Sequence, residues 1–177
     1  MLDTLGAMII RDATEADLPA IVAIYNESIP GGKATADLFP ITVEERRDWF
    51  REFDPDRRPC WVAEDEGKVV ACVYLRSFYA GRPAYNKTAE ISTYISASHQ
   101  GQGLGTRLKK MMIAECPRLR VENLLSFYFD HNEASRRVNE KLGFQDAAHL
   151  QEIAEVFGEK RGLVIAILRL KAGSGNP

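Results

Sequence analysis

The stretch from Ile91 to Arg107, ISTYISASHQGQGLGTR, constrains the fold of this chain more than any other segment. Its first half alternates, so that Ile91, Thr93 and Ile95 share one face of a predicted strand. A turn of small and polar residues follows, and apolar residues recur at helical spacing from Leu104 onward. Glycines in the turn leave backbone amides uncovered at the start of that helix. Free N–H groups and the positive end of the helix dipole together predict an anion site.

Two familiar glycine motifs do not fit this turn. The residues after Gly105 are threonine and arginine, whereas a P-loop requires lysine followed by serine or threonine. Gly101, Gly103 and Gly105 are spaced G-x-G-x-G, which is not the G-x-G-x-x-G of dinucleotide-binding proteins. The segment does fit the pattern Gln/Arg-x-x-Gly-x-Gly/Ala, beginning at Gln100. An ordinary glycine-rich connection between a strand and a helix is the alternative reading of the loop taken alone.

This pattern resembles the acetyl-CoA pyrophosphate loop of the GNAT superfamily of N-acetyltransferases. Further motifs resemble the phosphinothricin acetyltransferase branch of that superfamily, and they occur in the order of the family over nearly the whole chain. They are RDATEAD at 11–17, TAE at 88–90, Tyr94, Ser96, His99-Gln100, Asn132 and LGF at 142–144.

The predicted elements follow the order β-α-α-β-β-β-α-β-α-β-β, beginning with a strand at Met8–Arg11 and ending with one at Leu163–Leu170. This order predicts a mixed α/β sheet of six or seven strands. The resemblance implies a GNAT-type, mostly antiparallel sheet flanked by about four helices. It also implies a central splay between the strand ending near Ser96 and the strand starting near Leu124. We expect one domain over residues 1–171 and a frayed polar tail over 172–177.

The composition excludes several classes of protein. A net charge of −2 provides no basic field for nucleic acid or an anionic membrane, and no apolar run has the length of a membrane span. The N-terminus lacks the features of a signal peptide. Cys60, Cys72 and Cys116 are scattered and odd in number, which is typical of reduced thiols in a cytoplasmic protein. We therefore expect a cytoplasmic protein without nucleic-acid or membrane partners.

Transfer of an acetyl group from a thioester to an amine requires a base for the amine, stabilisation of the carbonyl oxygen and departure of the thiolate. The resemblance implies that Glu90 is the general base, acting directly or through a water, because it stands in the Thr-Ala-Glu setting of the branch. The alternative reading is a strand-end glutamate paired with Lys87 or Arg82.

The resemblance also implies acetyl-CoA as co-substrate. A backbone N–H of Tyr94 or Ile95 is expected at the acetyl carbonyl, although the side chain of Tyr94 reads as a packed aromatic. Asn132 is expected at the pantetheine arm, a role compatible with capping a helix. The histidines His99, His131 and His149 have no ligand spacing, so no metal is expected. The full predicted acetyl-CoA site is Tyr94, Ile95, Gln100, Gly101, Gln102, Gly103, Leu104, Gly105, Thr106, Asn132 and Ser135.

Two positions depart from the pattern of the family. Many GNAT enzymes have a tyrosine, and the phosphinothricin branch has a histidine, that protonates the leaving thiolate. This chain has Asn139 at that position. An amide is not an acid near neutral pH. The thiolate therefore leaves without a proton, or it takes a proton from water or from another residue. Near the last strand, Glu159 to Gly162 replace the Trp and Asp of a Gly-x-Trp-x-Asp signature, so the acceptor of the branch does not transfer directly.

We expect a small-molecule, amino-acid-like primary amine as acceptor, in a pocket shaped by residues 31–41, 78–87 and 157–162. The branch also implies a homodimer. The alternatives are a protein or peptide N-acetyltransferase and a non-catalytic acyl-CoA sensor. The sequence leaves open the identity of the acceptor and the length of the acyl chain.

Overall fold

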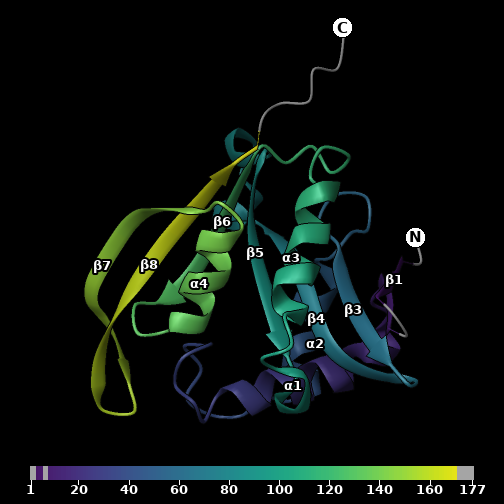
Figure 1. Cartoon of the computed structure of the whole chain (residues 1–177), viewed down its shortest axis with the longest axis horizontal. Helices are drawn as coiled ribbons and strands as arrows, with labels where there is room; N and C mark the ends of the chain where they lie inside the picture. The colour runs from purple at the N-terminus through teal and green to yellow at the C-terminus, as the bar shows by residue number, and fades with distance from the viewer. Residues whose placement is uncertain (1–2, 6–7, 171–177) are drawn as a thin grey trace, which may run out of the picture.

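The computed structural model describes residues 3–5 and 8–170 and shows a mixed α/β sheet with helices on both faces (Figure 1). The helices are α1 (Leu18–Ser28), α2 (Val43–Arg51), α3 (Leu104–Glu115) and α4 (Glu133–Lys141). The strands are β1 (Asp3–Leu5), β2 (Met8–Asp12), β3 (Cys60–Asp65), β4 (Lys68–Ser77), β5 (Thr88–Ile95), β6 (Asn123–Phe129), β7 (Gln145–Val156) and β8 (Glu159–Arg169).

Within these residues the strands form one eight-stranded sheet in the order β1-β2-β3-β4-β5-β6-β8-β7. The predicted fold class is confirmed: every neighbouring pair is antiparallel except β5 and β6, which are parallel. The sheet has one strand more than the six or seven predicted. The additional strand is β1, whose three residues pair with β2 but are too few to carry a visible alternation. The tail predicted at 172–177 lies outside the described residues.

The sheet opens between its two parallel strands. β5 and β6 pair at Thr88 with Asn123, at Ala89 with Leu124 and at Glu90 with Leu125, and no further pairing between these two strands is recorded. The predicted central splay is therefore present, and Glu90 is the last paired residue of β5 before the strands diverge.

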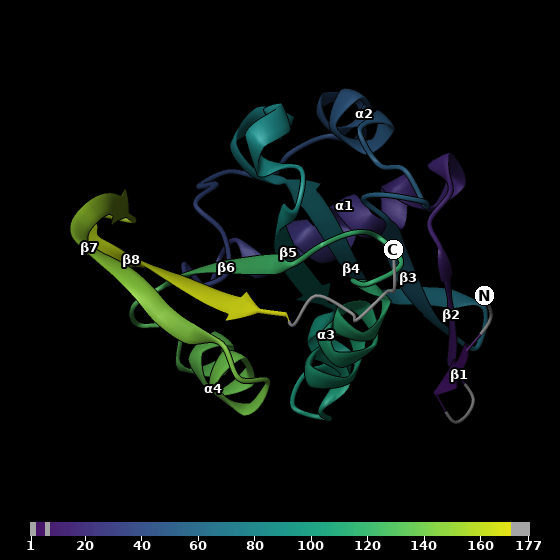
Figure 2. The ribbon, with the colours of Figure 1, turned by 90° about the horizontal axis from the view of Figure 1, so that it is seen from above.

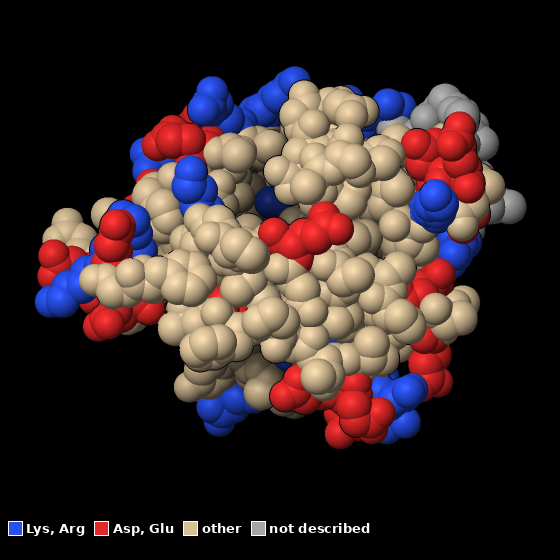
Figure 3. Space-filling view, turned by 90° about the horizontal axis from the view of Figure 1, so that it is seen from below, with Lys and Arg blue, Asp and Glu red and all other residues tan. Residues whose placement is uncertain are grey.

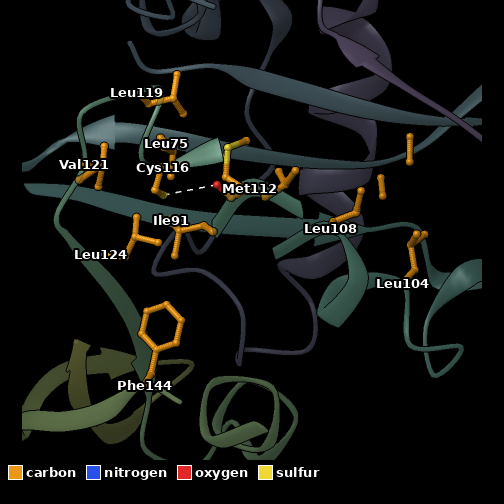
Figure 4. Close-up of a cluster of buried hydrophobic side chains, with 14 of the residues drawn as sticks. Leu75, Ile91, Leu104, Leu108, Met112, Cys116, Leu119, Val121, Leu124 and Phe144 are labelled. Atoms are coloured by element: carbon orange, nitrogen blue, oxygen red, sulfur yellow. Dashed lines mark hydrogen bonds between the residues drawn. The ribbon is translucent and has the colours of Figure 1, made fainter. Parts of the chain in front are cut away.

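The helices divide between the two faces of the sheet, with α1 and α2 on one face and α3 and α4 on the other (Figure 2). The larger core lies under α3, where Leu104, Leu108 and Met112 pack against residues such as Leu75 and Ile91 (Figure 4). A smaller cluster on the α1 face contains Ile21, Cys60, Val62, Cys72 and Tyr74. The alternation of β5 thus sends Ile91 to one core and Tyr94 toward the other.

No helix in the described ranges is long and apolar enough to cross a membrane. The cysteines Cys60, Cys72 and Cys116 are free and buried, so none forms a disulfide with another.

The entry into α1 is fixed by a partly buried ion pair. Asp17 closes a capping box with Thr14, and its carboxylate accepts from the guanidinium of Arg11 at 2.7 Å. Arg11 also binds Glu64 at 3.0 Å, so the arginine links β2, the turn before α1 and β3. The hydrogen bond from Arg11 lowers the pKa of Asp17 from 3.8 to about 2, although burial acts in the opposite direction.

We expect Asp17→Asn to lower the free energy of unfolding by about 1–2 kcal/mol at pH 7, because the folded state prefers the charged carboxylate. The pKa of Asp17 is depressed in the folded state, so its contribution is present above the unfolded value of 3.8 and disappears as pH falls to about 2. Urea unfolding at pH 7 and near pH 2 measures this difference. The exposed Glu15→Gln is the control, and an Asp17→Asn effect that is equal at both pH values would contradict the explanation.

Candidate active site

The connection between β5 and α3 is a glycine-rich loop that begins with a short turn over Ala97–His99. Gly101 and Gly103 have φ of 75° and 79°, in the left-handed region that glycine adopts without strain. Gly103 is the N-cap of α3. At Gly105 a Cβ atom would lie 3.0 Å from Cδ1 of Ile95, so the missing side chain lets α3 approach β5 closely.

The backbone N–H groups of residues 100–106 in this loop are free to bind a ligand. The first recorded helical bond is from the N–H of Arg107 to the carbonyl of Gly103 at 3.1 Å. Within the described ranges, no recorded acceptor takes a hydrogen bond from the N–H groups of 100–106. The structure thus brings the predicted residues from Gln100 to Thr106 together at a helix N-terminus suited to a diphosphate.

The two glutamines of the loop brace its backbone. Gln100 donates from Nε2 to the carbonyl of Ile95 at 3.0 Å, and Gln102 donates from Nε2 to the carbonyl of Ser98 at 3.2 Å. Their side chains therefore hold the turn in shape, and it is their backbone N–H groups that remain free.

The loop is anchored to two other parts of the molecule. The Asp65 carboxylate at the end of β3 accepts from Nε2 of His99 at 3.2 Å. The N–H of Ala97 donates to Glu27 of α1 at 2.8 Å. His99 thus has a structural role in the loop.

Of the two backbone groups predicted to meet the acetyl carbonyl, the structure favours Ile95. The N–H of Ser96 donates to the carbonyl of Val70 in β4 at 2.9 Å. Because N–H groups of an antiparallel strand alternate in direction, that of Tyr94, opposite Cys72, also belongs to the β4 ladder. The N–H of Ile95 points away from β4, into the splay.

The side chain of Tyr94 is a packed aromatic, as expected. Its ring centroid lies 4.9 Å from that of Tyr25 and 6.3 Å from that of Tyr74. These rings line a small pocket on the α1 and α2 face, together with Arg46 and Trp49.

Glu90 lies half-buried at the point where β5 and β6 separate, on the same face as this pocket. Burial raises the pKa of Glu90, while the positive charge of Arg76, which stands opposite it on β4, acts in the other direction. A carboxylate with a raised pKa takes up a proton more readily than an exposed one, which suits a general base.

The alternative reading of Glu90 as half of a surface ion pair is contradicted. Lys87 instead binds Glu122 at 2.6 Å. Arg82 lies over the ring of Tyr79, 5.6 Å from its centroid. No recorded ion pair or side-chain hydrogen bond within the described residues uses the carboxylate of Glu90.

Asn132 performs two structural tasks at the head of α4. Its Oδ1 accepts from the N–H of Ser135 at 3.0 Å, which confirms the capping role, and its Nδ2 donates to the carbonyl of Lys33 at 2.9 Å. The neighbouring His131 donates from Nε2 to the carbonyl of Gly32 at 3.0 Å. The connection between α1 and α2 is therefore tied to the start of α4.

A buried lysine that the sequence pattern does not distinguish contacts Asn139. Lys109 of α3 donates from Nζ to Oδ1 of Asn139 at 3.0 Å and to Oγ of Ser126 at 3.2 Å. In the sequence, Lys109 follows Leu108 on an amphipathic helix. A lysine exposed to solvent could stand at the same place, so the sequence does not reveal that Lys109 is buried. His149, also unexplained by sequence, donates from Nε2 to the carboxylate of Asp130 at 3.1 Å.

Buried polar atoms without a protein partner lie on the α3 and α4 face of the sheet. Among the described residues, Oγ1 of Thr93 and Nδ2 of Asn139 have no recorded hydrogen bond. The end of the molecule at which β5 ends and α3 begins is hollowed near its centre, with a basic side chain at the floor and acidic atoms at the edge (Figure 3). Free loop amides and unpaired polar atoms fit a long ligand with a diphosphate and amide groups, such as acetyl-CoA.

In the described part of the chain, no group of three or more His, Cys, Asp or Glu residues is arranged to hold a metal ion.

Comparison with known proteins identifies one family. The family model described as the acetyltransferase (GNAT) family matches residues 18–144. YwnH of Bacillus subtilis (strain 168), whose name assigns it provisionally to the phosphinothricin acetyltransferases, is 43% identical over 159 residues, which are 89% of this chain and 96% of that protein.

Two further proteins resemble nearly the whole chain. The L-methionine sulfoximine/L-methionine sulfone acetyltransferase of Salmonella typhimurium (strain LT2) is 30% identical over 166 residues, which cover 92% of this chain and 95% of the relative. A phosphinothricin acetyltransferase from Sinorhizobium meliloti, solved in complex with acetyl-CoA, superposes with a TM-score of 0.87 at 27% identity and covers 97% of this chain and 92% of its own.

We expect Gly103→Ala to weaken acetyl-CoA binding about tenfold or more, because alanine disfavours a φ of 79° and the amides at the start of α3 would reorient. Isothermal titration calorimetry measures the change. Gly67→Ala is the matched control, since Gly67 has a φ of 76° in the β3–β4 turn and, as at Gly103, an added Cβ atom would meet no atom within 4 Å. Equal binding by the two variants would show that the loop amides do not hold the ligand.

Proposed function

We propose, from the premise that this chain belongs to the GNAT family of acetyltransferases, that it transfers the acetyl group of acetyl-CoA to the primary amine of a small, amino-acid-like acceptor. The observation that carries the proposal is the position of Glu90. A half-buried carboxylate without an ion-pair partner among the described residues stands where the sheet opens, on the face of the sheet that also carries a small pocket lined by aromatic side chains.

In this proposal Glu90 removes a proton from the acceptor ammonium, directly or through a water. The raised pKa of Glu90 brings it closer to neutral pH than an exposed glutamate, which increases its strength as a base. The free N–H of Ile95 supports the acetyl carbonyl as negative charge develops on its oxygen. The amides of 100–106 hold the diphosphate of acetyl-CoA, and Asn132 and Ser135 lie at the head of α4 beside its pantetheine arm.

The pocket on the α1 and α2 face has a volume of only about 10 Å³ in this structure, so it is the chemistry of its lining that supports an amino-acid-like acceptor. Arg46 is a basic residue of its lining, with its guanidinium 4.7 Å from the ring centroid of Tyr25 and 3.2 Å from the carboxylate of Asp37. An acceptor with its own carboxylate is able to compete with Asp37 for Arg46. The names of the relatives, which specify phosphinothricin and methionine sulfone or sulfoximine, agree with such an acceptor.

We further propose a cytoplasmic homodimer. The hairpin of β7 and β8 exposes 58% of Ile153 and 56% of Phe157, and large apolar side chains exposed together are typical of an interface. Sedimentation equilibrium tests the dimer.

The acceptor is tested by incubating the protein with acetyl-CoA and a panel of small amines, including phosphinothricin, methionine sulfone, methionine sulfoximine and common amino acids. Mass spectrometry of the amide product avoids interference from protein thiols. We expect acetylation of at least one amino-acid-like member. Binding of acetyl-CoA with no acetylated member would refute a small amino-acid-like acceptor and direct attention to the Glu159–Gly162 turn.

We expect Glu90→Gln to reduce kcat about 10²- to 10⁴-fold, because the amide cannot accept the proton of the ammonium. In the unaltered enzyme kcat should fall as pH drops through the raised pKa of Glu90, above the ordinary value of 4.5, and the variant should lack this acid limb. Steady-state kinetics from pH 5 to 9 measure both effects. The control is Glu122→Gln, which removes a surface carboxylate remote from the pocket; an equal rate for the two variants would eliminate Glu90 as the base.

A further inference from the structure

Lys109 is a buried cation that the proposed mechanism has not used. It lies on α3 with 7% of its surface exposed, enclosed by β6 and α4. Its Nζ atom donates to Ser126 and Asn139, and lies 5.8 Å from the ring centroid of Phe144. An ammonium group has three donors, so one N–H remains beyond these two recorded bonds.

The surroundings of Lys109 do not neutralise its charge. β6 presents a hydroxyl, α4 an amide and the segment after α4 an aromatic ring, and no recorded ion pair in the described residues includes Lys109. Burial alone lowers the pKa of Lys109 to about 8. A lysine buried without a carboxylate is costly for folding, which indicates that it serves another purpose.

The position of Lys109 is defined by the opening of the sheet. Leu125 is the partner of Glu90 in the last pair of β5 and β6, and Ser126 is the next residue of β6. Successive side chains of a strand point to opposite faces, so Glu90 and Leu125 face α1 and α2 while Ser126 faces α3 and α4. The Glu90 carboxylate and the Lys109 ammonium therefore stand on opposite faces of the sheet, at the level where its strands diverge.

The neighbouring amide adds a second donor to this position. Asn139 is 1% exposed, and its Oδ1 is used by Lys109 while its Nδ2 has no recorded partner within the described ranges. The hydrogen bonds to Ser126 and Asn139 fix the Lys109 side chain in one rotamer. The cluster thus holds N–H donors, and no carboxylate, against Ser126, the residue of β6 next to its last pair with β5.

We propose that Lys109 is the proton donor to the thiolate that leaves acetyl-CoA, with Ser126 and Asn139 as the positioning residues that aim its Nζ atom. The proposal rests on the proposed acetyl transfer. It assigns the two protonation steps to opposite faces of the sheet, with Glu90 as the base on the acceptor side and Lys109 as the acid on the donor side.

The step balances as follows. Glu90 takes one proton from the acceptor ammonium, and the neutral nitrogen forms a C–N bond with the carbonyl carbon. When the C–S bond breaks, its electron pair goes to sulfur, which receives a proton from the Lys109 ammonium. The second proton on nitrogen leaves through Glu90 to solvent, and the neutral Lys109 amine takes a proton from solvent after the products leave. The products are the amide, CoA thiol and one proton.

The acidities of the two partners suit this transfer. An ordinary alkyl thiol has a pKa of about 8.5, close to the lowered pKa of about 8 of Lys109. A proton moves between such groups with little change in free energy, whereas a lysine with the usual pKa of about 10.4 would be a much weaker acid.

Lys109→Met tests the proposal, since methionine retains an unbranched side chain without the charge. Its control is Lys110→Met, which removes the exposed adjacent lysine of the same helix. We expect Lys109→Met to lower kcat about 100-fold or more, with the KM for acetyl-CoA changed less than about threefold. The unaltered enzyme should also lose kcat as pH rises through about 8, and Lys109→Met should lack this alkaline limb. A kcat within threefold of the control, or a retained alkaline limb, would overturn the assignment.

A second measurement does not depend on turnover or on the stability of the variant. The thiol of CoA bound to the unaltered protein is titrated by its ultraviolet thiolate absorbance, with desulfo-CoA as blank. A neighbouring ammonium should lower the apparent pKa of the bound thiol by at least one unit relative to free CoA. An unchanged or raised thiol pKa would overturn the proposal. Failure of the acetyl-transfer proposal is recognised separately, by the absence of product from every amine while this titration still reports on Lys109.

Discussion

The loss of hydrogen bonds between β5 and β6 after the pair of Glu90 and Leu125 is the constraint on which the rest of this structure depends. A continuous parallel ladder would use the outward N–H of Ile95 and close the interior of the sheet. Because the ladder stops, β5 keeps backbone donors free. Side chains from both faces of the sheet also lie at the same position along the strands. The opening is therefore a feature that the surrounding helices must support, since unpaired strand edges are otherwise unfavourable.

That support comes from packing on the two faces. Leu108 and Met112 are fully buried and hold α3 against β4 and β5, so β5 stays in place without β6 along its second half. Gly105 permits this close approach beside Ile95. On the other face Tyr25 of α1 packs its ring, tilted, against Tyr94, which stacks on Tyr74. The same packing that stabilises the fold fixes the distance across the opening.

The sequence predicted what depends on local chemistry. The glycine-rich turn before α3 and the alternation of β5 are both present. The additional strand β1 was not predicted, because three residues carry no period. The choice of Ile95 over Tyr94 depends on the register with β4, and the burial of Lys109 depends on how α3 and α4 pack. Both are tertiary properties, so neither composition nor spacing reveals them. The roles of Glu90 and of the acetyl-CoA residues stay predictions supported by their placement.

The two bonds that His131 and Asn132 make to the carbonyls of Gly32 and Lys33 each join residues 99 positions apart in the chain. Bringing such distant residues together costs loop-closure entropy, which rises only slowly with the length of the loop. The connection between α1 and α2 is held against the start of α4 by these polar contacts. For the same reason it is the part that opens at the least cost, because breaking a few polar contacts there leaves both apolar cores intact. Exchange of ligands thus needs only a local fluctuation, of a kind that amide hydrogen exchange detects at residues 31–35 before any strand of the sheet.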